Sequence, residues 1–273
     1  MILTPHTILE VAQHRAIGMF TFDLVRYLLG AGVVALAVWG LRRTGWASRK
    51  IQKRAATGAD IRREMLASIR TVMVFTVFSV LTVWGMSQGY LSGMEPSHGL
   101  AIDVTILIAL LLVHDAYFYW THRAMHHPKL FRAFHRFHHR TITPTPWAAY
   151  SFAVPEAVVM AVFMPIWLAL VPTPVWVTFT FLAVMILRNA MGHAGLELHA
   201  RGWASHPVLK WISTTTHHDL HHAGSFNHNF GFYLTFWDKV MGTEHPDYVA
   251  TYDRVTAPAP KPASTELAPS PVL

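Results

Sequence analysis

The chain has 273 residues, of which 52% are hydrophobic and only 14% are charged. This composition, with a mean hydropathy of +0.31, is unusual for a soluble domain and favours an integral membrane protein. A pI near 9.9 could indicate a nucleic-acid partner, but the basic residues lie beside apolar stretches. We therefore expect the lipid bilayer as a partner and no nucleic acid. The absence of cysteine excludes disulfides and thiolate metal sites.

The first apolar stretch, residues 17–41, is long enough to cross ~30 Å of hydrocarbon, which takes ~20 helical residues. We expect a retained helix rather than a cleaved leader, because Arg15 is the only basic residue before this stretch and the apolar run continues to Gly40. Asp23 and Arg26 interrupt the stretch, and we expect both charges near the interface.

Basic residues predict the orientation of the spans. Residues 41–70 hold nine Lys or Arg, which the positive-inside rule assigns to the cytoplasm. A second span, 71–94, leads to a connector without Lys or Arg, and a third span, 99–120, returns to the first side. Residues 121–152 carry five further Lys or Arg and are also expected on the cytoplasmic side.

A long uncharged stretch follows, from 157 to 187. Pro172-Thr173-Pro174 divides it into halves of about fifteen residues, which form either two thin spans or one hairpin that dips in and returns. Either arrangement brings the chain back to the same side. The Pro-, Ala- and Ser-rich segment 253–273 cannot bury a core, so we expect a disordered tail there.

Histidines gather in two distant parts of the chain. Residues 114–139 include seven histidines, and T-H-H-D-L-H-H at 216–222 repeats the theme. Spacings of three and four residues recur within these clusters, and on a helix they place imidazoles on one face. Isolated histidines are more often core or surface residues, and we interpret these five in that way: His6, His14, His98, His206 and His245.

The ligand type restricts the metal. Imidazole suits zinc, copper, iron and nickel, and the chain offers neither thiolates nor a clear pair of carboxylates. A structural zinc site uses four ligands in a closed tetrahedron. Nine or ten clustered histidines are too many for one such ion, so they favour two metals with open positions. A redox-active pair, iron above all, is the leading hypothesis.

The order of the histidine motifs resembles a known family. H-R-A-M-H-H, H-R-F-H-H and H-H-D-L-H-H, followed by N-H-N-F-G and F-W-D-K-V-M-G-T, are similar to the membrane fatty acid hydroxylase and sterol desaturase superfamily over residues 114–245. The resemblance implies an O2-dependent di-iron oxidase with an all-helical membrane fold, in which zinc can replace iron in isolated material. His193 in G-H-A-G resembles the intermediate histidine of the sterol methyl oxidases.

Carried over by position, the resemblance implies ten metal-binding, catalytic histidines: His122, His126, His135, His138, His139, His193, His217, His218, His221 and His222. His217 is the tenth and least supported by the motif. Four residues could orient these imidazoles or act as interfacial anchors: Asp115, Tyr119, Asp219 and Asp238. His114 and His127 are expected to donate hydrogen bonds behind the ligands, and outer positions are expected for His199 and His228.

Together these features predict an all-α integral membrane protein with about four to five apolar helices and a cytosolic, helical, histidine-rich metal domain. We expect a transmembrane anchor with a basic cytosolic loop at 1–98, a fatty acid hydroxylase-like catalytic domain at 99–252, and the tail at 253–273. The expected location is a bacterial inner membrane or the endoplasmic reticulum, as a multi-pass protein with its metal site on the cytoplasmic side.

Two classes of function remain open at this point. One is an oxidoreductase that hydroxylates or desaturates a sterol, fatty acyl or related lipid. No G-x-G-x-x-G fingerprint occurs, so this enzyme requires an external electron donor, a ferredoxin or a cytochrome b-type protein with its reductase. The other is a membrane metal transporter or metal-binding protein. A transporter would place polar residues midway along several spans, whereas these histidines cluster at one end of them.

Overall fold

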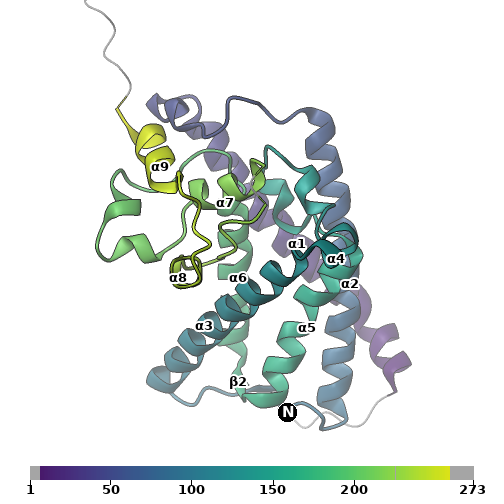
Figure 1. Cartoon of the computed structure of the whole chain (residues 1–273). Helices are drawn as coiled ribbons and strands as arrows, with labels where there is room; N and C mark the ends of the chain where they lie inside the picture. The colour runs from purple at the N-terminus through teal and green to yellow at the C-terminus, as the bar shows by residue number, and fades with distance from the viewer. Residues whose placement is uncertain (1–6, 225, 259–273) are drawn as a thin grey trace, which may run out of the picture.

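A computed structural model of the chain describes residues 7–224 and 226–258, and in this part five long helices form a bundle (Figure 1). The long helices are α1 (Ile8–Leu41), α2 (Gly58–Ser87), α3 (Leu100–Met125), α5 (Val154–Leu170) and α6 (Val175–Gly192). Short helices cover one end: α4 (Pro128–Phe134), α7 (Thr215–His222), α8 (Phe236–Val240) and α9 (Tyr248–Thr256). Two-residue strands β1 (Met94–Glu95) and β2 (Thr173–Pro174) pair in parallel at the opposite end.

Five 3-10 turns connect these helices in the described residues. They are η1 (Gly45–Arg49), η2 (His138–Arg140), η3 (Pro146–Tyr150), η4 (Trp203–Ser205) and η5 (Leu209–Trp211). Two of them, η2 and η3, lie between α4 and α5 and bring the second histidine motif back over the bundle.

Capping boxes begin the first two helices. In α1, Thr7 caps the backbone N–H of Glu10, whose carboxylate accepts from Thr7 in return. Thr57 and Asp60 repeat this arrangement in α2. The second cap lies fourteen residues before the predicted span at 71, so residues 58–70 of the expected basic loop are helical.

Four helices, α1, α2, α3 and α6, are long and apolar enough to cross a membrane, and large apolar side chains such as Leu29 and Leu36 on α1 are exposed. The shorter apolar helix α5 is separated from α6 by Pro172-Thr173-Pro174, and both helices contribute side chains to one hydrophobic cluster. The expected all-α membrane fold is therefore confirmed. The second span ends at Ser87 rather than at 94, where a turn precedes β1.

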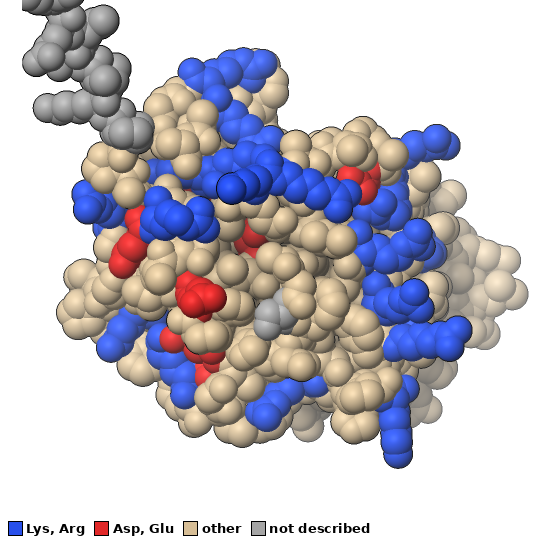
Figure 2. All heavy atoms as spheres, turned by 45° about the horizontal axis from the view of Figure 1, so that its top comes forward, with Lys and Arg blue, Asp and Glu red and all other residues tan. Residues whose placement is uncertain are grey.

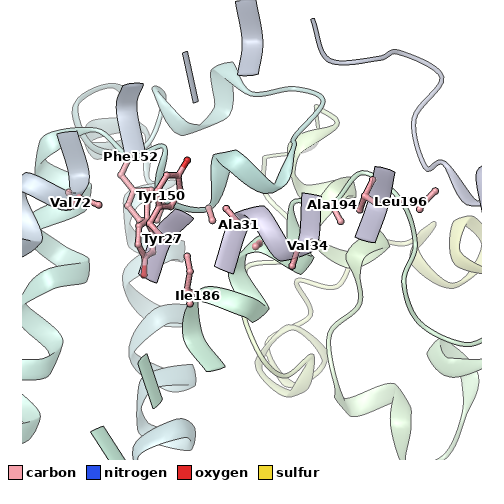
Figure 3. Close-up of a cluster of buried hydrophobic side chains, with 13 residues drawn as sticks. Tyr27, Ala31, Val34, Val72, Tyr150, Phe152, Ile186, Ala194 and Leu196 are labelled. Carbon is pink, nitrogen blue, oxygen red and sulfur yellow. The ribbon is translucent and has the colours of Figure 1, made fainter. Parts of the chain in front are cut away.

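The N-terminal helices share a hydrophobic core with the later ones. Tyr27 and Ala31 of α1 and Val72 of α2 pack with Tyr150 and Ile186 (Figure 3). Segments from both sides of residue 98 therefore contribute to one core. At the other end of the chain, residues 253–256 of the expected tail are helical within α9, and 259–273 lie outside the described residues.

The end of the bundle that carries α7 and α9 is rich in positive charge. Lys and Arg side chains lie around the rim of this face, and Asp and Glu side chains are fewer (Figure 2). The basic residues between α1 and the start of α2 contribute to it, as the sequence predicts for a segment beside the headgroups.

Candidate metal centre

The histidines come from the ends of helices that meet at one place. His122 lies in the last turn of α3, and His126 caps that helix. Pro128 begins α4 immediately afterwards, and His135 caps its C-terminus. His193 caps α6. Helix ends therefore present these four imidazoles, whereas His218 lies within α7.

Nine buried histidines form two adjacent groups. The five-histidine group contains His122, His126, His135, His139 and His221. The four-histidine group contains His138, His193, His218 and His222. Within each group the available ligand nitrogens lie within 4.8 Å of one another. His139 and His222 connect the groups, with ring centroids 4.9 Å apart.

The Nε2 atoms converge within each group. In the five-histidine group, Nε2 of His122 lies 2.9 Å from that of His135, and Nε2 of His126 lies 3.2 Å from that of His139. In the four-histidine group, Nε2 of His193 lies 3.1 Å from that of His218. Nitrogen ligands about 2.1 Å from one ion lie about 3.0 Å apart at right angles and about 3.4 Å apart at the tetrahedral angle. The observed spacings match this range.

The other ring nitrogen of several imidazoles donates to an oxygen that can only accept. Nδ1 of His138 donates to the Ser151 carbonyl at 3.3 Å, and Nδ1 of His193 donates to the Asn189 carbonyl at 2.8 Å. A neutral imidazole carries one proton, so Nε2 of both rings is unprotonated. These two Nε2 atoms nevertheless lie 3.3 Å apart. Two lone pairs at this distance repel each other, and a metal cation bound by both nitrogen atoms would remove the repulsion. The residues therefore fit a metal ion.

Burial keeps the imidazoles neutral, which metal binding requires. For His139, His218, His221 and His222, burial lowers the pKa well below its ordinary value, and neighbouring imidazoles lower it further. Hydrogen bonds from Nδ1 of His221 to the His228 carbonyl and from Nδ1 of His222 to the Thr141 carbonyl only partly oppose this effect.

His217 lies outside both groups. Its Nε2 is 3.4 Å from Oδ2 of Asp238, and its ring packs edge-on against Tyr248. The side chain at 217 is one position before His218 on α7, so it points about 100° away around the helix axis. We therefore leave His217 out of the ligand set that we propose below.

A loop at residues 227–231 orients two imidazoles. The Phe230 carbonyl accepts from Nδ1 of His122 at 2.9 Å, and the His228 carbonyl accepts from Nδ1 of His221 at 2.6 Å. Asn229, with φ of 59°, donates from Nδ2 to the His217 carbonyl. Gly231 has no space for a side chain, because a Cβ would lie 2.4 Å from the Leu234 carbonyl oxygen. These contacts give the N-H-N-F-G motif a structural role.

Three of the predicted orienting residues contact this loop or the segments that flank it, rather than the nine clustered imidazoles. Asp238 accepts from the backbone N–H groups of Phe230 and Gly231 at 2.9 and 2.7 Å. Asp115 accepts from the N–H of Tyr233 at 2.8 Å, and the Tyr119 hydroxyl lies 2.9 Å from that of Thr243.

Asp219 has a different partner. It accepts from Nε2 of Gln52, which precedes α2, at 2.8 Å, and it contacts none of the nine imidazoles through a hydrogen bond among the described residues. Burial raises the pKa of Asp219 to about 7, although the Gln52 hydrogen bond opposes the shift. This contact ties the first inter-helix loop to α7.

Two buried carboxylates support the centre and were not expected from the sequence. Oε1 of Glu156, in the first turn of α5, accepts from Nδ1 of His135 at 2.7 Å. Glu197 accepts from the N–H and hydroxyl of Thr216 at 2.7 and 2.6 Å, and so holds the start of α7. The sequence feature that could have indicated a role for Glu156 is its position as a single carboxylate directly before the long uncharged stretch.

The expected outer histidines are distributed around the site. His114 is buried against Phe163 and Phe181, 4.7 and 5.1 Å between ring centroids. His199 pairs with Glu197. His127 caps α4 from an exposed position, and His228 contributes its carbonyl to the loop. All four of these histidines lie outside the five-histidine and four-histidine groups.

An apolar cavity of about 450 Å³ lies beneath the four-histidine group, among α1, α2, α3, α5 and α6. Its lining includes Phe152 and Asn189. The Phe152 ring lies 5.5 Å from that of His138, and the Asn189 carbonyl accepts from His193. Asp23 and Arg26 also line it. These two charged residues lie near the middle of α1 and are largely buried.

Comparison with known proteins identifies relatives with sterol-modifying names. The chain is 33% identical to human cholesterol 25-hydroxylase over 175 residues, covering 62% of each chain. It is 27% identical to human lathosterol oxidase over 189 residues, covering 67% of this chain and 61% of the relative. It is 32% identical to a Delta(7)-sterol 5(6)-desaturase of Gibberella zeae, over 50% of this chain and 40% of the relative. The chain thus spans about six tenths or less of these relatives' lengths.

No solved structure is significantly similar to the chain. The model of the fatty acid hydroxylase family matches residues 107–243, which make up half of the sequence and include all nine clustered histidines. With the ordered histidine motifs, the helical membrane fold and the sterol hydroxylase and desaturase relatives, this match shows that the chain belongs to the fatty acid hydroxylase family.

Proposed function

We propose that this protein is a membrane-bound oxidoreductase that uses O2 and external electrons to hydroxylate or desaturate a lipid. The observation that carries the proposal is the position of the nine buried imidazoles directly above an apolar cavity. The names of the relatives support lipid oxidation as the reaction class.

Two iron ions, one in each group, suit the donor set better than one. Their ligands would be His122, His126, His135, His139 and His221 for one ion, and His138, His193, His218 and His222 for the other. Bound iron supplies O2 activation and one-electron chemistry, which imidazole alone cannot. The protein contributes neutral, converging Nε2 atoms and fixes their tautomers from behind through backbone carbonyls and Glu156.

The cavity supplies the place for the substrate. Its walls are aromatic and aliphatic, including Phe75, Phe163 and Phe181, and they exclude water from the reacting carbon. The cavity ends at Phe152 and Asn189, next to ligands of the four-histidine group. An apolar substrate in this cavity would therefore present one end to the centre.

The electrons must come from another protein, for which we propose a ferredoxin or a cytochrome b-type donor. The basic rim of the histidine-bearing face is complementary to an acidic carrier and would speed its approach (Figure 2). Metal transport is less well supported, because both histidine groups lie together at one end of the bundle rather than along a path through it.

Metal content tests the dinuclear site. We expect two irons per wild-type chain by elemental analysis, about one in His221→Ala and His222→Ala, which each remove a ligand from a different group, and two in the matched control His127→Ala. One metal in the wild type, unchanged by either ligand variant, would contradict the site.

The reaction is tested in cells. Expression under air should produce lipids with a mass change of +16 or −2, and His221→Ala should abolish them while the protein still inserts into the membrane. Formation of the same product at the same level without O2 would contradict oxidative chemistry and favour the transport alternative.

A further inference from the structure

A buried ion pair lies inside the apolar cavity. Nη2 of Arg26 donates to Oδ1 of Asp23 at 2.7 Å, and the two side chains are only 9% and 6% exposed. Both residues are near the middle of α1, a helix that is long and apolar enough to cross a membrane. A charged pair in such a place is costly and calls for a functional explanation.

The arginine keeps unused donors. Nε and Nη1 of Arg26 have no hydrogen-bond partner among the described residues, and neither does the buried hydroxyl of Tyr150. The guanidinium carbon lies 5.7 Å from the centroid of the Tyr150 ring. Arg26, Asp23 and Tyr150 all line the cavity. Arginine does not lose its proton, so these donors need an acceptor that occupies the cavity.

The charge balance indicates the kind of acceptor. Asp23 already neutralises Arg26, and a carboxylate or phosphate would approach Asp23 as a like charge. Among the described residues, Oδ2 of Asp23 has only one hydrogen-bond contact, a long one of 3.5 Å to the Ser79 hydroxyl. A neutral alcohol both accepts and donates, so it could bond to Arg26 and Asp23 together.

The polar groups are at the end of the cavity nearest the histidines. Along α1 the lining runs from His14 to Arg26, which is its last lining residue on that helix. The Tyr150 ring lies 6.2 Å from Phe152, whose ring lies 5.5 Å from His138. Figure 3 shows Tyr150 and Phe152 side by side. One aromatic side chain therefore separates the polar groups from the metal centre.

We propose that Arg26, Asp23 and Tyr150 form a subsite that binds the hydroxyl group of an amphipathic lipid alcohol. The apolar body of that lipid extends away from the histidines, toward Met86 and Met94. The carbon that is oxidised then lies a few bonds from the hydroxyl group rather than at the far end of the molecule. This inference rests on the proposed function of the cavity as the substrate site.

Binding to the metal-free protein tests the subsite independently of turnover. The probes are two matched pairs, cholesterol with cholest-5-ene and 1-hexadecanol with hexadecane, together with palmitate. Affinities are measured for purified, chelator-treated protein in detergent micelles. We expect the alcohol of at least one pair to bind about tenfold more tightly than its hydrocarbon, and more tightly than palmitate binds.

The variants separate the subsite from general hydrophobic binding. In Asp23→Asn/Arg26→Met, which removes both charges and leaves neither unpaired, the alcohol preference should fall to about one while hydrocarbon binding is retained. Tyr150→Phe removes a hydroxyl that has no partner in the described structure, so it should fold and reduce the preference severalfold. Arg43→Met, just beyond the C-terminal end of the same helix and outside the cavity lining, should behave as wild type.

Four results would overturn the subsite. They are failure of both alcohols to bind, equal binding of alcohol and hydrocarbon by the wild type, an alcohol preference that survives in the double variant, and tighter binding of palmitate than of either alcohol. If the preference depends on Arg26 but O2 and reductant yield no oxidised lipid, the subsite stands and the proposed function fails. If lipid oxidation proceeds without any dependence on Arg26, the proposed function stands and the subsite fails.

Discussion

Single backbone carbonyl oxygens fix the orientation of several imidazole rings in the candidate metal centre. His122, His221 and His222 each donate from Nδ1 to a backbone carbonyl, and all three carbonyls belong to loops. Loops are less rigid than helices, so something must hold them. Asp238 does so for the loop at 227–231 through two backbone N–H groups.

Replacement of Asp238 by Asn should therefore weaken metal binding. Burial alone would raise the pKa of Asp238, but hydrogen bonds from His217, Thr243 and Gly231 lower it, so the carboxylate is ionised and accepts only. The side-chain amide of an asparagine would place an NH2 donor opposite one of the backbone N–H donors that Asp238 now accepts from. We expect a 10–100-fold loss of iron affinity, measured by competition with a chelator. The exposed Asp253→Asn is the control, and equal affinity in both variants would contradict this role.

The buried imidazoles also predict how stability depends on pH. Burial lowers the pKa of His139, His218, His221 and His222, so the folded chain holds them neutral where the unfolded chain, with an ordinary pKa of about 6.5, takes up protons. Metal-free protein should lose stability as the pH falls below about 6.5. Carboxyl groups with a raised pKa, such as Asp219, have the opposite effect because they favour the folded state at low pH, but the buried imidazoles are more numerous.

Thermal unfolding of chelator-treated protein between pH 8 and pH 5 measures this dependence. The variants His127→Ala and His206→Ala remove exposed histidines and should leave the profile unchanged. A melting temperature that rises toward pH 5 would show that the imidazoles are not held neutral.

At the scale of elements, the close approach of α1 to α6 shapes both the core and the cavity. Gly30 of α1 lies against Ile186 of α6, and a Cβ at position 30 would be 2.6 Å from Cγ1 of that isoleucine. Tyr27, one turn earlier, packs on Tyr150 and donates to the Trp147 carbonyl at 2.9 Å. The helix that carries Arg26 is thus held in register with the site.

Gly30→Ala should be destabilising by about 1–3 kcal/mol, because Ile186 is branched and buried and cannot move aside freely. Gly18→Ala, on the same helix but with open space around the position, should be neutral or stabilising by up to about 1 kcal/mol. Unfolding in a denaturing detergent compares the two. Addition of Ile186→Val to Gly30→Ala should recover part of the loss, and equal stability of both alanine variants would contradict the tight contact.

For the whole molecule, the two ends of the bundle should lie on opposite sides of the membrane. Ser97 precedes α3 near the β1–β2 end, and Ser205 lies in η4, which contacts α9 at the histidine-bearing end. The natural chain has no cysteine, so a single Cys at either position reports its own side.

We expect Ser97→Cys to react with an impermeant maleimide in intact cells, and Ser205→Cys only after lysis, because the basic connectors favour the cytoplasm. The reverse pattern would show the opposite orientation. Labelling of both positions from one side would contradict a bundle that spans the membrane.

Composition and spacing predicted the helical membrane fold and the clustering of the histidines, because hydropathy and helical periodicity are local properties of a chain. The apolar stretches near α1, α2 and α3 could be read directly, although caps extended α2 well before the expected start. The resemblance to the family motifs likewise named all nine clustered histidines, together with His217, which lies outside both groups.

Only the tertiary structure decided how those histidines divide. His221 joins one group and His222 the other, although they are adjacent in sequence, because the groups are completed by residues from α3 and α6. The same holds for Glu156 beside His135 and for Arg26 inside the cavity. No spacing rule predicts these contacts, because they depend on which distant helix packs opposite each residue.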